Sequence, residues 1–234
     1  MTGVQTCALP ILLLFLIFPL LLPALSALAN FEINPPYECS PKGDSPRHLG
    51  SPSCLENSVR EERDAYCEPI SISELDASEA DQIFRELAEN PEIPFRFLPD
   101  GCQARAQRMA EIFIKKGFYP AKIFVKGKFE FENPWDPLWR VRWQYHVAIV
   151  LKVHRELVVM DPSLFSKPVG IEYFLDFFRQ LPVTKIDEVF LTDPYVYELN
   201  HRDLILSGFR SRDLECGEEL IRTGLIFQKL QKRP

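Results

Sequence analysis

Residues 141–153 read VRWQYHVAIVLKV, and residues 156–160 read ELVVM after a break of two residues, His154 and Arg155. Both stretches are rich in valine and other side chains that favour β-structure. The short break predicts a tight hairpin between two strands. Because both faces of the longer strand are largely apolar, we expect it to lie inside a sheet that helices cover.

The same hairpin carries a histidine and an aspartate. Strict alternation divides the longer strand into two faces, one with Gln144, His146, Ala148 and Val150 and the other with Trp143, Tyr145, Val147 and Ile149. Asp161 directly follows the second strand and precedes Pro162. Since a hairpin pairs residues across its turn, we expect His146 and Asp161 to lie within reach of each other. The simpler interpretations are a core histidine with satisfied hydrogen bonds and an ordinary turn at Asp161-Pro162.

A helix that begins with a cysteine is predicted over residues 102–116, and Gly117 is expected to end it. Its apolar face consists of Cys102, Ala106, Met109, Ala110 and Phe113. Asp100-Gly101 permits a sharp turn before the helix, and Asp100 is a candidate N-terminal cap. The free N–H groups and the positive dipole end at the helix start favour a thiolate at Cys102. A buried or disulfide-bonded cysteine is the alternative.

Cys102, His146 and Asp161 occur in the order of a papain-type thiol acyl-transfer site. In such a site the cysteine attacks a carbonyl carbon as a thiolate, and the histidine takes and returns the proton. The aspartate fixes the imidazole tautomer and stabilises the charged ring. The backbone N–H of Cys102 is a natural oxyanion donor. Because the three residues are far apart in the sequence, only the fold can bring them together.

The remaining segments show no internal repeat and mix the two periodicities of secondary structure. Helices are predicted at residues 73–90, 172–181 and 213–231, and further strands at residues 121–125 and 183–191. Together with the hairpin, these elements predict an α+β fold in which the nucleophile lies at a helix N-terminus that packs on an antiparallel sheet.

The N-terminal region predicts secretion or export to a periplasm. Residues 11–22 form an apolar run, and residues 27–29 read ALA and fit a signal-peptidase site, so residues 1–29 are expected to be a signal peptide. A membrane span is the rival interpretation, but the run is short and contains Pro19. Residues 1–10 lack the positive charge that begins a signal peptide and resemble a translated sequencing adapter, so we assign them no function.

Residues 30–72 are rich in proline, serine and charge, and we expect an irregular extension or pro-segment there, followed by a catalytic domain over residues 73–234. Without the signal peptide the cysteines are Cys39, Cys54, Cys67, Cys102 and Cys216. In an oxidising compartment, two disulfides and one free thiol form a natural solution, and a free thiol at Cys102 fits the site. The spacing does not determine which four cysteines pair.

The charge of the chain argues against nucleic acid as a partner, because the net charge is −6. A basic stretch comprises Lys115, Lys116, Lys122, Lys126 and Lys128. We interpret it as a solvated face, and attraction of acidic protein substrates is the alternative. Trp135, Trp139 and Trp143 recur every four residues before the histidine. Packing in the core or against a loop is the preferred interpretation of these indoles, and the wall of a substrate cleft is the alternative.

Three segments resemble the catalytic segments of the bacterial protein-glutaminases, which are secreted protein-glutamine deamidases. Residues 93–106 read IPFRFLPDGCQARA around the cysteine, residues 143–150 read WQYHVAIV around the histidine, and residues 159–165 read VMDPSLF around the aspartate. The similarity covers about residues 93–175. The chain departs from the family pattern at Gln103 and Gln107, where the family carries an aromatic residue and a histidine. Both positions flank the site, so the departure concerns substrate preference.

The resemblance implies hydrolysis of glutamine side-chain amides in proteins or peptides, through a thioester on Cys102, with His146 and Asp161 completing the triad. It implies no cofactor and no metal, and an α+β core of the papain and transglutaminase type. We expect a monomer without stable membrane insertion. Members of the family are made with a pro-segment that blocks the cleft, so part of residues 30–90 is a candidate for that role.

Other functions use related chemistry or none. A transglutaminase would pass the same acyl group to an amine, and a thiol protease would cleave the backbone amide. A non-catalytic secreted binding domain would keep the fold with a vestigial site. These alternatives predict crosslinks, new N-termini and no reaction, respectively.

Overall fold

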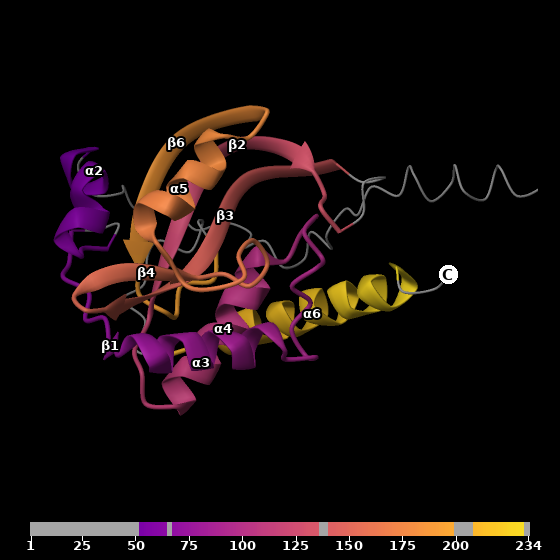
Figure 1. The fold of residues 1–234 in the computed structure, drawn as a ribbon, viewed down its shortest axis with the longest axis horizontal. Coiled ribbons are helices and arrows are strands. Elements are labelled where there is room, and N and C mark those ends of the chain that lie inside the picture. The colour runs from indigo at the N-terminus through magenta and orange to yellow at the C-terminus, as the bar shows by residue number, and fades with distance from the viewer. Residues whose placement is uncertain (1–51, 65–66, 136–139, 199–207, 232–234) are drawn as a thin grey trace, which may run out of the picture. The chain divides into compact units, whose positions relative to one another are not determined.

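The protein is described by a computed structural model (Figure 1). The structure describes residues 52–64, 67–135, 140–198 and 208–231. The chain divides into two compact units, Met1–Tyr37 and Glu38–Pro234, and every described residue belongs to the second. The expected signal peptide of residues 1–29 lies outside the described residues, as do Cys39 and Trp139.

One sheet organises the described part of the chain. Its strand order is β5 (Val169–Gly170), β4 (Glu156–Met160), β3 (Arg140–Val153), β2 (Ala121–Glu132) and β6 (Val183–Thr192). These neighbours all pair antiparallel, and the short strand β1 (Glu74–Leu75) adds a parallel pairing to the end of β3. The long β3 therefore lies in the interior of the sheet, as its apolar sequence predicts.

The β3–β4 hairpin has the tight turn that the sequence predicts. His154 and Arg155 both adopt positive φ, 52° and 68°, as the two central residues of a type I′ turn do. This turn sets the register, in which Val153 pairs with Glu156 and Ile149 with Met160. Asp161 thus leaves the sheet beside the segment of β3 that contains His146.

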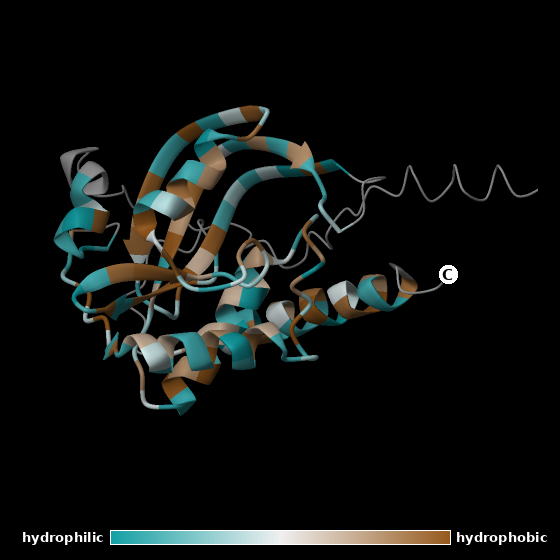
Figure 2. Ribbon diagram, viewed as in Figure 1, coloured by the Kyte–Doolittle hydropathy of each residue, from teal (hydrophilic) through white to brown (hydrophobic). Residues whose placement is uncertain are grey.

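Helices cover both faces of the sheet (Figure 1). The helices of the described residues are α2 (Pro52–Glu61), α3 (Ala77–Ala88), α4 (Cys102–Lys115), α5 (Ile171–Arg179) and α6 (Ser211–Gln231). On one face α3 and α4 pack against Val147, Ile149 and Leu151 of β3, and on the other face α5 packs against Ala148 and Val150. Figure 2 shows hydrophobic residues concentrated in strands such as β4 and the end of β6. Burial of each such aliphatic side chain contributes about 1.5–3 kcal/mol.

The predicted apolar face of α4 is confirmed. Its members are buried, namely Cys102, Ala106, Met109, Ala110 and Phe113. Gly117 follows the helix with φ +89°, a conformation that favours glycine and ends the helix as predicted. The helix thus presents its apolar face, from Cys102 to Phe113, to the core and Lys115 at its end to solvent.

The start of α3 differs from the prediction. The helix begins at Ala77, where the Asp76 side chain accepts a hydrogen bond from the Glu79 N–H (2.8 Å), whereas the sequence predicts a start at Ser73. The Ser73 hydroxyl instead accepts from the Tyr119 N–H (2.7 Å). Pairing of β1 with β3 holds the preceding residues in an extended conformation, so the helix cannot begin earlier.

Residues 52–64 are more regular than the sequence predicts. They contain α2, which packs against β6. The Ser58 hydroxyl accepts from the Leu191 N–H (2.9 Å) and donates to the Arg63 carbonyl (2.5 Å), and Asp64 forms a parallel bridge with Leu191. These bonds satisfy backbone groups on an edge strand, so the segment covers the edge of the sheet.

Strand β2 is longer than predicted and contains a bulge. The pairing register with β3 shifts between Lys126 and Phe129, opposite the segment before His146. A Cβ on Gly127 would lie 1.9 Å from the Lys185 carbonyl oxygen, so the close approach of β6 requires glycine. The bulge interrupts strict alternation in this part of the sheet.

The long helix α6 packs against the segment that leads to Cys102. Phe227 stacks on Phe97 with ring centroids 5.1 Å apart, and a Cβ on Gly224 would lie 2.7 Å from Pro94. Arg108 of α4 forms an ion pair with Glu218 of α6. The helix therefore supports, from outside the sheet, the segment that leads to the turn before Cys102.

Candidate active site

A sharp turn places Cys102 at the start of α4. Gly101 has φ +82°, in the left-handed region, and its N–H donates to the Asp100 carboxylate (2.6 Å). The residue that caps α4 is Gly101, without a side-chain hydrogen bond, so the prediction of Asp100 as the cap is wrong. The Asp100 carboxylate instead accepts the Gly101 N–H within the turn. The Cys102 side chain is buried, with 7% of the residue exposed.

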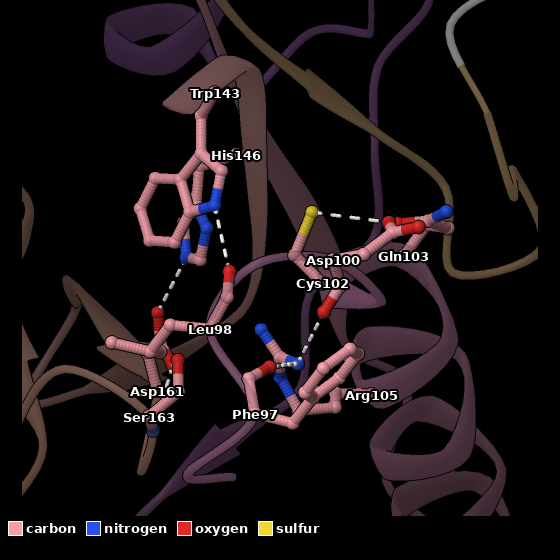
Figure 3. A network of polar contacts seen from close by, with 10 residues as sticks. All are labelled: Phe97, Leu98, Asp100, Cys102, Gln103, Arg105, Trp143, His146, Asp161 and Ser163. Carbon is pink, nitrogen blue, oxygen red and sulfur yellow. Dashed lines mark hydrogen bonds and ion pairs between the residues drawn. The ribbon is translucent and has the colours of Figure 1, made fainter. Parts of the chain in front are cut away.

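His146 and Asp161 form a buried pair. Nε2 of His146 lies 2.6 Å from Oδ2 of Asp161, and the residues are 1% and 3% exposed (Figure 3). The other carboxylate oxygen accepts from the Ser163 N–H (3.0 Å) and hydroxyl (2.5 Å). The prediction that the hairpin brings these two residues together is confirmed.

Trp143 fixes the imidazole from one side. Its ring stacks on His146 with centroids 4.5 Å apart, and its Nε1 donates to the Leu98 carbonyl (2.8 Å). Strict alternation predicts that Trp143 and His146 point to opposite faces, and that prediction is wrong. The pairing register of β3 with β2 shifts at this stretch, between the pairs of Lys126 and Phe129, and here β3 departs from strict alternation.

The pair leaves one ring nitrogen of His146 free for proton transfer. Burial raises the pKa of Asp161, but the charge and hydrogen bond of His146, the Ser163 hydroxyl and Arg105 outweigh burial and hold this pKa below its usual 3.8. An ionised Asp161 accepts the Nε2–H, so the neutral ring carries its lone pair on Nδ1. Nδ1 is buried and has no hydrogen-bond partner among the described residues.

The Cys102 thiol lies against β3 but donates elsewhere. Its Sγ donates to Oε1 of Gln103 (3.5 Å), and the Val147 N–H stabilises the sulfur. In Figure 3 the sulfur and Asp161 lie on different sides of the imidazole. The structure therefore joins His146 to Asp161 by a hydrogen bond and places Cys102 at the same site without a bond to His146.

The thiol is protonated in this arrangement. Burial raises the pKa of Cys102 to about 12, and the Asp100 and Asp161 charges add to the rise. The Arg105 guanidinium and the Val147 N–H act in the opposite direction. The prediction that the helix start lowers the thiol pKa is wrong for this structure, because loss of water outweighs the helix dipole.

Several buried polar side chains surround the site, namely Gln103, Arg105, Gln107 and Lys122. Sequence reasoning places Gln103 and Gln107 beside the site but misses the burial of Arg105 and Lys122. Nζ of Lys122 donates to Oε1 of Gln107 (2.7 Å) and to the Val196 carbonyl (2.7 Å), and burial lowers its pKa to about 7. The prediction of a solvated Lys122 is therefore wrong. A signal existed for Arg105, because a residue three positions after Cys102 lies on the same side of a helix.

The described residues provide information on metal binding, membrane spanning and cysteine pairing. Among the residues that the structure describes, no cluster of histidine, cysteine and carboxylate side chains is suited to a metal ion. Within the same part of the chain, no helix combines the length and hydrophobicity that a bilayer span requires. Cys102 is a free thiol, whereas Cys67 and Cys216 are not free.

The fold and the site define an α+β protein with a free cysteine at a helix start, beside a His–Asp pair on an antiparallel hairpin. A family model described as "Glutaminase" matches residues 80–176, which contain Cys102, His146 and Asp161. Over this stretch the chain is similar to the protein-glutaminases. A search of curated proteins finds no match.

Solved protein-glutaminases resemble the chain in fold. A crystal structure of protein-glutaminase shares 25% identity at a TM-score of 0.54, over 66% of this chain and 90% of that chain. The NMR structure of protein-glutaminase from Chryseobacterium proteolyticum shares 24% identity at a TM-score of 0.50, over 63% and 86%. The A47Q2 mutant of pro-protein-glutaminase shares 28% identity at a TM-score of 0.47, over 54% of this chain and only 50% of the relative.

Proposed function

We propose that the chain is a protein-glutamine deamidase, which hydrolyses glutamine side-chain amides of proteins to glutamate and ammonia. One observation carries the proposal. The stretch that matches the glutaminase family contains a free cysteine at a helix start and a histidine whose Nε2 bonds Asp161 while its Nδ1 is free. This is the distribution of roles that a thiol acyl-transfer site requires.

The first half of the reaction forms a thioester. His146 Nδ1 takes the Cys102 proton, and the sulfur attacks the carboxamide carbon of the substrate. The negative oxygen that forms is stabilised by the N–H groups at the start of α4, which have no intrahelical acceptor. The C–N bond breaks as His146 returns the proton to nitrogen, so ammonia leaves and the acyl group stays on Cys102.

The second half hydrolyses the thioester. His146 takes a proton from water, the hydroxide attacks the acyl carbon, and the sulfur leaves with that proton, which gives glutamate and the free enzyme. Asp161 stays ionised throughout and stabilises the imidazolium that forms in each half. Neither half requires a cofactor or a metal ion.

The closed thiol must become accessible before it can react. Cys102 is 7% exposed and His146 1%, and the pKa of the thiol is about 12. We propose that substrate binding displaces the Gln103 carboxamide from the sulfur. Transfer of the proton to His146 then forms an ion pair, which stabilises the thiolate.

The chain organisation is proposed to follow the family. Residues 1–29 would be a signal peptide for secretion or export to a periplasm, residues 30–72 an extension, and residues 73–234 the catalytic domain with a papain- or transglutaminase-like core. An inhibitory pro-segment would have to end before α3, because Phe84 and Leu87 of that helix are each only 1% exposed within the core. Two disulfides are proposed among Cys39, Cys54, Cys67 and Cys216, and which cysteines pair with each other is not assigned.

The mature protein would act as a monomer on proteins or peptides that bear glutamine. Incubation with a glutamine-bearing protein tests the function: we expect ammonia and an added negative charge on the substrate without new N-termini. Covalent crosslinks would indicate a transglutaminase, and cleaved chains a thiol protease. If neither the wild type nor Cys102→Ala changes the substrate, the chain is a binding domain and the proposal is overturned.

A further inference from the structure

We propose that Arg105 is a positioning residue of this site, which locks the turn that carries Cys102 and holds a positive charge beneath the reacting groups. The inference rests on the proposed thiol chemistry, because it concerns how the thiolate is presented. It starts from a guanidinium that is almost completely buried, since Arg105 is 2% exposed. A buried charge is costly and needs compensation by nearby acceptors or anions.

The geometry of Arg105 joins the first turn of α4 to the segment before it. Nη1 donates to the Phe97 carbonyl (2.6 Å) and to the Asp100 carbonyl (2.9 Å), as Figure 3 shows. Both acceptors belong to the backbone that leads into Cys102. A Cβ on Gly101 would lie 3.6 Å from the same Nη1, so the guanidinium also packs under the left-handed residue of the turn. Loss of these bonds would release the backbone immediately before the nucleophile.

The acceptors of Arg105 do not neutralise it. Both are carbonyl oxygens, and its Nη2 is buried without a hydrogen-bond partner among the described residues. The anionic groups in electrostatic contact with it are Asp100, Asp161 and the ionised form of Cys102. The only one of these that forms during the proposed reaction is the thiolate. The positive charge is therefore better compensated when Cys102 is ionised than when it is protonated.

The positive charge of Arg105 acts on two groups of the proposed reaction, Cys102 and Asp161. Arg105 is the largest influence that lowers the pKa of Cys102, and it also helps to lower the pKa of Asp161. Other titratable groups face the thiol from the surrounding elements, namely Asp100 from the turn, Tyr145 and His146 from β3, Asp161 after β4 and Tyr197 after β6. Of these, only His146 can add a second positive charge.

The test measures the thiol rather than the overall reaction. The rate at which iodoacetamide alkylates Cys102 is recorded against pH in the full chain without substrate, for the wild type, Arg105→Gln and Arg105→Lys. Arg108→Gln serves as the matched control, because Arg108 lies on the same helix, is partly exposed and pairs with Glu111 and Glu218. Circular dichroism establishes that each variant is folded.

At each pH near neutrality we expect Arg105→Gln to lower the alkylation rate by about tenfold or more, because an opposite charge nearby shifts a pKa by roughly 1–3 units and each unit lowers the thiolate fraction tenfold. Arg105→Lys, which keeps the charge without the planar fork, should move it in the same direction by less. Arg108→Gln should leave the profile unchanged. A folded Arg105→Gln whose profile coincides with that of the wild type would overturn the proposal, and Arg105→Lys decides by the same criterion if the glutamine variant does not fold. Ammonia release by the wild type separately tests the proposed function.

Discussion

The hairpin that carries His146 and Asp161 and the turn that carries Cys102 meet at one site but differ in their state of readiness. In the hairpin, the carboxylate is ionised, both its oxygens are bonded, and the imidazole is stacked on Trp143. In the turn, the thiol is protonated and donates to a neighbouring carboxamide. In the proposed mechanism the acid–base half would therefore be preassembled, whereas the nucleophile half would be activated when substrate binds.

Cys102→Ala changes the turn and leaves the hairpin intact, and it should have the largest effect on the reaction. The variant keeps the His146–Asp161 pair but has no nucleophile, so we expect ammonia release to fall by at least about 10³-fold. The methyl group remains in a buried position, so the melting temperature should change little. Ammonia release close to the wild-type rate would show that Cys102 is not the nucleophile.

Asp161→Asn changes the hairpin and leaves the turn that carries Cys102 intact. The amide cannot fix the same tautomer of His146, so we expect kcat/KM to fall by roughly 10²–10⁴-fold. The free energy of unfolding should also fall, by about 1–3 kcal/mol, because the buried bonds to His146 and Ser163 are disturbed. Asp176→Asn on the exposed surface of α5 is the matched control. Equal effects of the two substitutions would contradict a special role for Asp161.

The pKa of Asp161 adds a pH test to the same variant. Its folded value lies below the usual 3.8, so its contribution to stability is present above about pH 4 and is lost as the pH falls through the folded pKa. Denaturant unfolding of the wild type should show this loss at acid pH, and Asp161→Asn should show less of it.

Lys122 adds a third case to the comparison of the hairpin and the turn. It is a buried group near the site that the proposed reaction does not use. Its pKa falls from 10.5 in the unfolded chain to about 7 in the fold, so between these values the unfolded chain binds a proton that the folded chain does not. The free energy of unfolding should therefore rise from pH 7 toward pH 10. We expect Lys122→Met to reduce this slope and the exposed Lys128→Met to retain it. An unchanged slope in Lys122→Met would show that Lys122 is charged in the fold.

Gln103→Ala should have the smallest effect. The substitution removes the acceptor of the Cys102 thiol and some of the cover over the sulfur. The loss of one hydrogen bond of about 1 kcal/mol corresponds to alkylation of Cys102 that is faster by about fivefold. A slower reaction would show that Gln103 supports the thiol rather than restrains it.

The sequence predicts the parts of this site that follow from local pattern. The apolar run of residues 141–153 predicts β3, the two-residue break predicts the hairpin, and the apolar face after Cys102 predicts α4. From these elements follows the contact between His146 and Asp161. Each depends on neighbours in the sequence or across one turn.

The parts that the sequence does not predict depend on long-range packing. The stacking of Trp143 on His146 accompanies a register shift between β2 and β3, and the start of α3 is set by pairing of β1 with β3. Burial of Lys122 and the high pKa of Cys102 depend on how many elements surround them. Periodicity does not report such tertiary burial, so charged residues within a basic stretch were expected in solvent.

Trapping of the acyl-enzyme tests the central claim most directly. The wild type is mixed with a glutamine-bearing peptide and quenched in acid, and mass spectrometry of the digested protein locates any thioester. We predict an adduct on the peptide that contains Cys102, formed together with the first ammonia released and absent from Cys102→Ala. Ammonia release without an adduct in the wild type, continuing in Cys102→Ala, would contradict the account.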